Sequence, residues 1–238
     1  MTQELEVNEN DPLLKLSRIG GWFAFIQAFT VVFIVVTYFI WPHVFSDHNV
    51  KMILEGIHSH PFIYFMKLDP FVPIALLFQL PVSMGLWSVL KKTDHAIAII
   101  ALVIGALSVA AILTTRPIIE MYSLSSQYSS AAIAEQQIYI SAGEALYTLF
   151  HGTAWAASIM LGGISYMMFA VIMRKNSVFR ASTAWTLMIS GIGALLVLIP
   201  VIGIIALFIA TFVGIVANIL CGIDLLKLTK KKRILNIQ

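Results

Sequence analysis

Apolar residues fall into six long runs along the 238-residue chain, and shorter segments between them carry most of the charged residues. Each run is close to the roughly 20 apolar residues that an α-helix needs to cross the hydrocarbon core of a bilayer. The pattern therefore predicts an all-α fold, a polytopic membrane bundle of six transmembrane helices. The predicted helices cover about residues 19–41, 71–90, 96–115, 146–173, 183–202 and 203–226.

Composition supports this reading, because 59% of the residues are hydrophobic and only 11% are charged. Soluble domains carry about 25% charged residues. We expect one bundle domain over residues 15–227, between a disordered cytoplasmic tail at 1–14 and a basic cytoplasmic tail at 228–238. The chain is basic overall, but its basic residues lie at helix ends and form no stripe, so no nucleic acid partner is expected.

The basic residues alternate along the chain in a way that predicts topology. Twelve of the fifteen Lys and Arg residues belong to alternate ends of the apolar runs, and short cytoplasmic loops are enriched in these residues. The asymmetry predicts a multi-pass protein of the cell inner (cytoplasmic) membrane with both termini cytoplasmic. The three exceptions, on the predicted outer side, are Lys51, Lys67 and Arg116.

Two predicted outer segments are longer than a hairpin needs. Residues 49–60 have apolar residues at helical spacing, which predicts a short interfacial helix that ends at Pro61. Residues 117–145 are polar and small, and we expect them to extend the third and fourth helices beyond the membrane, with a Ser-rich turn between. The apolar positions of the first segment are Val50, Ile53, Leu54 and Ile57.

Several features predict how the helices pack. Small residues recur every four positions in the fourth and sixth runs, which favours close contact between helices. Pro81 is expected to kink the second helix, because it removes one backbone hydrogen bond. Polar side chains within the runs are expected to hydrogen bond to neighbouring helices. The small residues are Ser158, Gly162, Ala210 and Gly214, and the polar ones are Gln27, Gln79 and Asn218.

One polar constellation is the leading candidate for a ligand site. Glu144, Thr148 and His151 share a face if the fourth helix is continuous, and Arg116 ends the third run at a similar depth to Glu144. Histidine exchanges protons near neutral pH, and Arg116 could hold an anionic group. The predicted ligand-binding residues of this outward-facing pocket are Arg116, Glu120, Glu144, Thr148, His151 and Trp155. The alternative is an ion pair between Arg116 and Glu144, with His151 hydrogen-bonded inside the bundle.

Histidines also gather in the first outer segment, where imidazole and carboxylate groups would suit a transition metal. Their spacing matches no strong zinc signature, so ordinary interfacial histidines are the favoured interpretation. Haem ligation by two histidines is set aside, because only His151 lies in an apolar run, and no cofactor is expected. The weak metal candidates are His43, Asp47, His48, His58 and His60.

Three stretches resemble a known group of proteins. They are RIGGWFAFIQAF from residue 18, HAIAIIALVIGALSVAA from residue 95, and EALYTLFHGTAW from residue 144 followed by SYMMFAVIMRKNSVF. They are similar to uncharacterised bacterial and archaeal six-span integral membrane proteins grouped as a domain-of-unknown-function family. The resemblance covers about residues 15–227. It implies a membrane bundle and carries over no activity, catalytic residue or cofactor.

Three functional hypotheses remain open. The first is a non-enzymatic membrane protein that binds or moves a small solute or lipid, hydrophobic or anionic, through the outward-facing pocket. The second is an intramembrane enzyme that acts on a lipid-like substrate with His151 and Glu144 as acid and base. The third is a structural or regulatory partner of another membrane protein. The expected partners are membrane lipids, and the sequence leaves homo-oligomer formation open.

Overall fold

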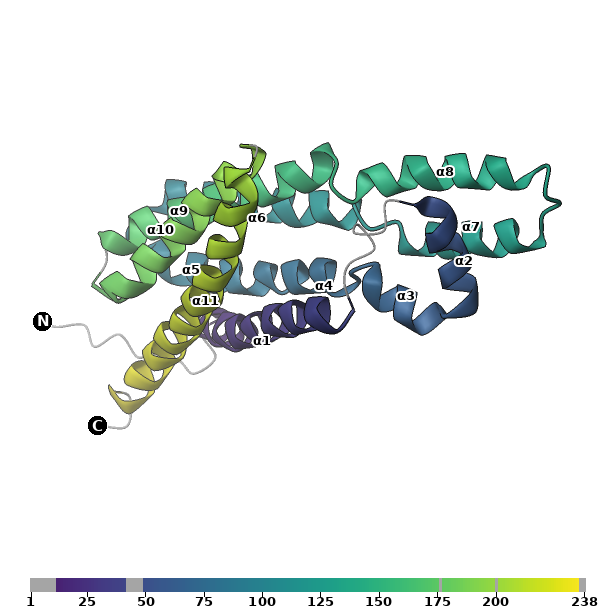
Figure 1. Cartoon of the computed structure of the whole chain (residues 1–238). Helices are drawn as coiled ribbons and strands as arrows, with labels where there is room; N and C mark the ends of the chain where they lie inside the picture. The colour runs from purple at the N-terminus through teal and green to yellow at the C-terminus, as the bar shows by residue number, and fades with distance from the viewer. Residues whose placement is uncertain (1–11, 42–48, 176, 200, 236–238) are drawn as a thin grey trace, which may run out of the picture.

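The computed structural model describes residues 12–41, 49–175, 177–199 and 201–235, with side chains except at 204 and 229–235 (Figure 1). All regular elements of these residues are helices, which confirms the all-α prediction. They are α1 (Pro12–Ile40), α2 (Val50–Ser59), α3 (Pro61–Lys67), α4 (Phe71–Leu77), α5 (Gln79–Leu90), α6 (His95–Leu113), α7 (Ile118–Ser130), α8 (Gln136–Leu149), α9 (Thr153–Arg174), α10 (Ala181–Leu195), a 3-10 turn (Leu196–Leu198) and α11 (Ile202–Leu235).

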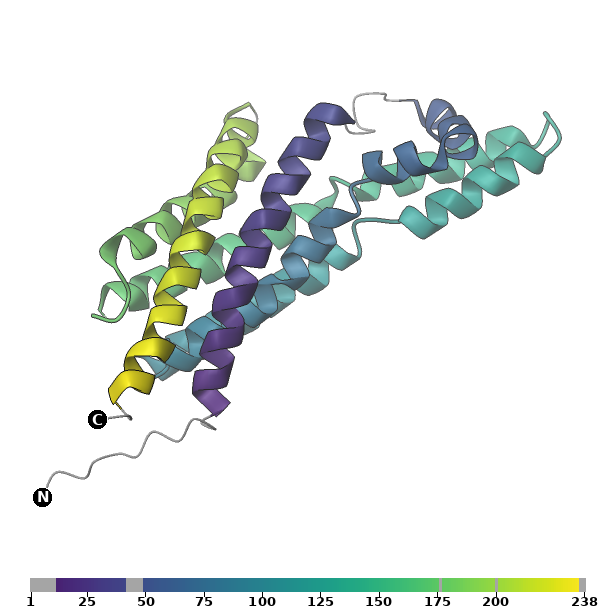
Figure 2. The same cartoon turned by 90° about the horizontal axis from the view of Figure 1, so that it is seen from below.

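Six helical segments are long and apolar enough to cross a membrane, so the structure is a polytopic helix bundle. Around the bundle α1 packs on α5, α5 on α6, α6 on α9, α9 on α10, and α10 on α11, which returns to α1. The bundle is therefore a closed ring of neighbouring helices, in which α1 (purple) and α11 (yellow) run side by side in Figure 2. Its buried core includes Leu86, Phe169 and Leu187.

The second span is broken at the place that its proline predicts. Helix α4 ends at Leu77 and α5 begins at Gln79, with Phe78 between them. Pro81 has no N–H to donate to the carbonyl of Leu77, which accounts for the interruption.

Small residues bring the helices into close contact, as predicted. Gly162 of α9 faces the Ser108 hydroxyl of α6, and that hydroxyl donates to the carbonyl of Ser158 at 2.8 Å. Gly20 and Gly85 bring α1 and α5 closer still, because a Cβ at Gly20 would lie 2.7 Å from the Gly85 Cα. Such contacts let backbones pack in a setting where lipid is as apolar as the side chains.

One end of the bundle holds the beginnings of α1, α6 and α10 and the ends of α5, α9 and α11, and we call it the basic end. Here Lys91 lies over the Trp87 ring at 4.4 Å, and Arg174 lies over the Trp185 ring at 4.5 Å. Asp224 of α11 accepts from the Arg180 Nε at 2.7 Å and so ties α11 to the start of α10.

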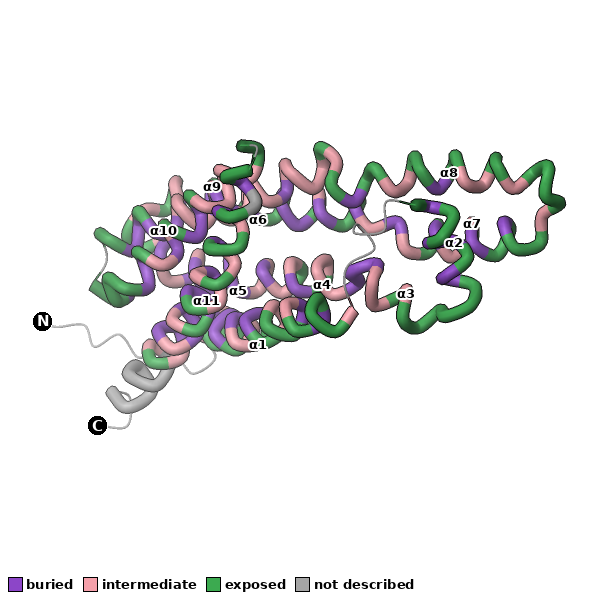
Figure 3. The backbone as a smooth tube through the Cα atoms, in the orientation of Figure 1, coloured by how far each residue is buried: buried purple, intermediate pink, exposed green. Residues whose placement is uncertain are grey.

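Helices α2, α3, α7 and α8 form a second packed unit at the opposite end, which we call the cap (Figure 1). Its core contains the apolar face of α2, with Ile53 and Leu54 fully buried, together with Met121 and Tyr128 of α7. The expected interfacial helix is thus present, but its apolar face packs on α7 and α8 and is not open to the membrane. In Figure 3 the tube of α2 includes several buried residues, whereas that of α8 is almost entirely exposed or intermediate.

The cap hairpin agrees with the sequence prediction. Helices α7 and α8 continue past the membrane-length helices α6 and α9, and the Ser-rich end of α7 leads into the connection at 131–135. Helix α6 has 19 residues. At 1.5 Å per residue it spans about 28 Å, close to the thickness of a bilayer's hydrocarbon core.

Candidate functional site

Arg116 lies at the joint between the bundle and the cap, and its guanidinium is engaged by the protein itself. The Nη2 atom lies 3.0 Å from Asp69 Oδ2, and both side chains are only 3% exposed. Nη1 donates to the carbonyl of Phe150 at 2.9 Å and to the Thr115 hydroxyl at 3.0 Å. Arg116 therefore ties together three connections, α3–α4, α6–α7 and α8–α9, and we call these residues the junction.

The backbone of Asp69 has an unusual conformation that the junction holds in place. Its φ is 61°, in the left-handed region, where Asp is tolerated better than most residues. Pro70 disfavours helix at the preceding residue, so α3 ends at Lys67 and the chain turns at Asp69. The Tyr38 hydroxyl of α1 faces the Asp69 carboxylate as well. The junction thus connects α1 to the cap.

The other predicted pocket residues do not gather around Arg116. Glu120 is exposed in the first turn of α7, and Glu144 and Thr148 are exposed on α8. The Thr148 hydroxyl donates to the carbonyl of Ala145 in its own helix at 2.7 Å. The expected ion pair between Arg116 and Glu144 is wrong, because Asp69 occupies that place.

His151 does not continue the helix that carries Glu144, so the assumption of one continuous fourth helix is wrong. Helix α8 ends at Leu149 and α9 begins at Thr153, with Gly152 as an extended N-cap. Buried Phe150 receives the Arg116 contact inside this break. His151 is exposed, and its ring packs edge-on against Trp155 with centroids 4.9 Å apart.

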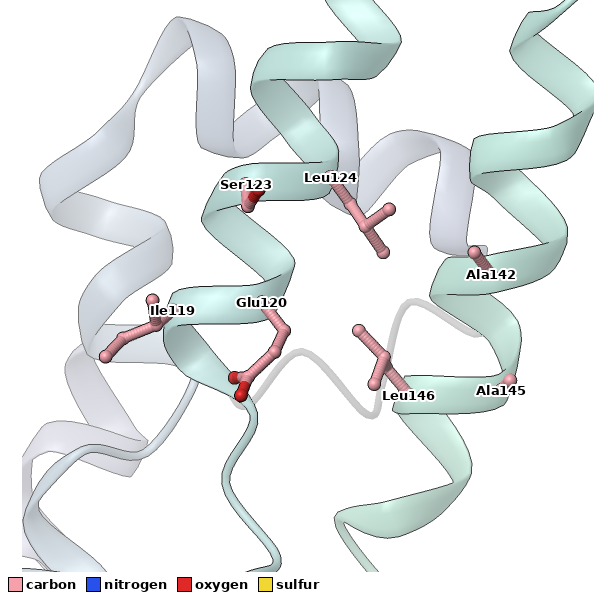
Figure 4. Close-up of a pocket in the computed structure, with 7 residues that line it drawn as sticks. All are labelled: Ile119, Glu120, Ser123, Leu124, Ala142, Ala145 and Leu146. Atoms are coloured by element: carbon pink, nitrogen blue, oxygen red, sulfur yellow. The ribbon is translucent and has the colours of Figure 1, made fainter.

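A groove lies between α7 and α8 on the cap, with a volume of about 590 Å³. Leu124 and Leu146 point into it from the two helices, and Ala142 and Ala145 form its α8 wall (Figure 4). Glu120 and Ser123 also border the groove, but its exposed lining is almost wholly apolar and the Glu120 carboxylate lies at its edge (Figure 4); Glu120 forms no ion pair with any described residue. Of the predicted site residues, this groove takes in Glu120 alone.

The hairpin that forms the groove is acidic. Residues 118–149 contain Glu120, Glu135 and Glu144 and no Lys or Arg. Several negative charges on one element make the local electrostatic potential more negative, which favours cations near the surface.

A buried polar cluster lies inside the ring of long apolar helices. Gln27 of α1 donates to Gln79 Oε1 at 2.8 Å, and the Tyr166 hydroxyl of α9 donates to the same oxygen at 2.5 Å. Gln79 in turn donates to the Ser83 hydroxyl at 3.1 Å. The Asn218 side chain of α11 also lies beside Tyr166. The predicted interhelical hydrogen bond of Gln27 and Gln79 is confirmed, and the cluster links four helices across the ring.

The metal candidates give no site among the residues that the structure describes, where no group of three potential ligands occurs. His58 is exposed in the last turn of α2, and His60 is the residue between α2 and α3. His43, Asp47 and His48 lie outside the described residues.

Asp69 and Tyr166 were not among the site residues predicted from the sequence. Asp69 had a recognisable signal, since it is an acidic residue directly before Pro70 at the start of an apolar run. In comparisons with known proteins, no family model matches the chain, and no curated protein or solved structure matches it.

Proposed function

We propose that this is a non-enzymatic multi-pass protein of the cytoplasmic membrane that binds an amphipathic organic cation in the cap groove between α7 and α8. The observation that carries the proposal is the groove itself, whose walls are apolar and whose charged group is the Glu120 carboxylate. Its volume of about 590 Å³ falls within the range of small-molecule sites, roughly 300–1,000 Å³.

The cap is proposed to face outside, with both termini in the cytoplasm. The basic end gathers Lys91, Lys92, Arg174, Lys175 and Arg180, whereas the cap hairpin has no basic residue. Excess Lys and Arg in short loops is typical of the cytoplasmic side. The resemblance to uncharacterised six-span proteins of bacteria and archaea stays a prediction.

The charge of the ligand follows from what the cap leaves available. Arg116, the residue expected to hold an anion, is buried and bonded to Asp69 and Phe150. Glu120 lines the groove and has no basic partner among the described residues. An apolar body with an amine or quaternary ammonium head would fill the groove and bring its charge to Glu120, so a cation fits better than the anionic ligand first expected.

Binding is favoured over catalysis and over transport. His151 packs against Trp155, and Glu144 lies on the separate helix α8, so the proposed acid and base have no common groove among those described. Below the cap, the hydrogen bonds between Gln79, Gln27 and Tyr166 join helices across the ring interior. No observation favours the enzyme hypothesis, and the third hypothesis, a partner protein, becomes an outcome of the test.

The proposal is tested by titrating the detergent-purified protein with rhodamine 6G, a lipophilic cation, and following fluorescence anisotropy. Ala145→Trp should abolish saturable binding because the indole fills the groove. Glu120→Gln should weaken binding by about fivefold, the value of one exposed charge pair of about 1 kcal/mol.

Glu135→Gln is the matched control, since it removes one carboxylate from the same hairpin at the α7–α8 connection, outside the groove. It should leave binding unchanged. Equal weakening by Glu120→Gln and Glu135→Gln, or full binding by Ala145→Trp, would contradict the site. Absence of saturable binding by the wild type would contradict the ligand class and leave the partner-protein hypothesis in its place.

A further inference from the structure

A second groove lies on the bundle, where α6, α9 and α10 meet, and has a volume of about 340 Å³. All of its lining side chains are apolar, so nothing in its walls would orient a polar solute. They are Ile97, Ile164, Met167, Met168, Val171 and Leu195.

This groove faces away from the ring interior. Tyr166 points inward, because its hydroxyl reaches Gln79 of α5 across the ring. At 100° per residue, Ile164, Met168 and Val171 lie roughly on the opposite side of α9 from Tyr166. Val171 is 40% exposed. In a membrane this surface would meet hydrocarbon, and its apolar walls suit an acyl chain.

The groove reaches the basic end of the bundle. Ile97 lies in the first turn of α6, and Val171 lies one turn before the end of α9. The two helices run antiparallel, and the Ser165 hydroxyl donates to the Ala101 carbonyl at 2.8 Å, which sets their register. The start of α6 is therefore level with the end of α9.

Positive charge surrounds this mouth of the groove. Lys92 is exposed beside the start of α6, and Lys175 is exposed at the C-cap of α9, whereas the His95 ring lies beside Trp87 of α5 with centroids 6.4 Å apart. The N-terminus of α6 adds partial positive charge from its backbone N–H groups. The one acidic residue there, Asp94, is the N-cap and accepts from the Ile97 N–H at 3.1 Å.

We propose that this groove and its basic mouth form a binding site for an anionic phospholipid in the membrane leaflet at the basic end. One acyl chain lies in the groove between α6, α9 and α10. The phosphate lies between Lys92 and Lys175. The positive charge of the mouth favours an anionic headgroup. A zwitterionic headgroup would place its ammonium group beside the same lysine side chains, which repel it.

The site is tested by native mass spectrometry of the detergent-purified protein, titrated with phosphatidylglycerol or with phosphatidylcholine of the same acyl chains. Wild type should retain phosphatidylglycerol preferentially. The double variant Lys92→Gln/Lys175→Gln should weaken its retention by about thirtyfold, at about 1 kcal/mol for each basic residue. Lys227→Gln, which removes one exposed lysine from α11 on another part of the ring, should change little.

The apolar part of the site has its own matched pair. Val171→Trp fills the groove and should reduce retention of both lipids. Val216→Trp makes the same change at a 48% exposed position on α11 and should not. Equal retention of the two lipids by wild type, an effect of Lys227→Gln as large as that of the double variant, or unchanged retention by Val171→Trp would each overturn the proposal.

Discussion

Replacing Asp69 by Asn should destabilise the protein strongly, although the change is one atom in size. Asn tolerates the left-handed backbone at this position as Asp does, so the φ of 61° adds no new strain. It also keeps an acceptor for the Arg116 guanidinium. The variant therefore removes the negative charge and little else.

The expected magnitude follows from burial. Both side chains are 3% exposed and their charged atoms are 3.0 Å apart, so the charge of Arg116 would be left in a site that excludes water. Removing one partner of a buried ion pair costs about 3–5 kcal/mol in the free energy of unfolding. Because Asn retains a hydrogen bond, about 3 kcal/mol is expected, a factor of about 150 in the unfolding equilibrium.

The assay is denaturant unfolding in mixed micelles, followed by tryptophan fluorescence. Lys51→Gln is the control, because its 3.8 Å pair with Glu55 is about half exposed and should contribute less than about 0.5 kcal/mol. The double variant Asp69→Asn/Arg116→Met should be less destabilised than the single one, since no buried charge remains. If Asp69→Asn costs no more than Lys51→Gln, the account of the junction is wrong.

Four further variants test the packing of the bundle by thermal or denaturant unfolding in detergent. Gly20→Ala should lower the melting temperature far more than Gly214→Ala, because the new Cβ would meet backbone at 2.7 Å in the first case and a serine hydroxyl at 3.1 Å in the second. Gln79→Leu should cost about 1–3 kcal/mol, since it leaves the Tyr166 hydroxyl and a second buried donor without their acceptor; no loss would refute the polar cluster. Asp224→Asn should lower the free energy of unfolding less than Asp69→Asn does, because the arginine that pairs with Asp224 is 42% exposed. A larger loss would contradict the expectation that the more buried ion pair contributes more to stability.

The sequence could predict the bundle because its signals are local. Apolar run length, the proline at position 81 and the four-residue spacing of Ser158 and Gly162 each act within one helix or one contact. The cap hairpin was also predictable, since the polar segment 117–145 directly continues two apolar runs. The sequence could not predict which surface the apolar face of α2 packs against, because an apolar helix face can pack equally well on a membrane or on another helix.

The site was predicted less well for a related reason. Arg116 was expected at the end of the third run and does lie between α6 and α7, but Glu144 and Asp69 are both acidic residues near the ends of neighbouring runs. Choosing between these two residues requires knowledge of the path of the α3–α4 connection. The hydrophobic periodicity of the sequence contains no information about that path. The break at Gly152 carried no proline, so the helix pattern ran through it and placed His151 on the wrong element.

The most direct test of the account is the side of the membrane on which the cap lies. Ser129→Cys, at the exposed end of α7, and Ser177→Cys, between α9 and α10, can be labelled with a membrane-impermeant maleimide in spheroplasts of a bacterial host. The natural Cys221 is buried and gives low background. The account predicts that Ser129→Cys labels in intact spheroplasts and Ser177→Cys only after lysis. Labelling of Ser177→Cys without lysis, with Ser129→Cys protected, would contradict it.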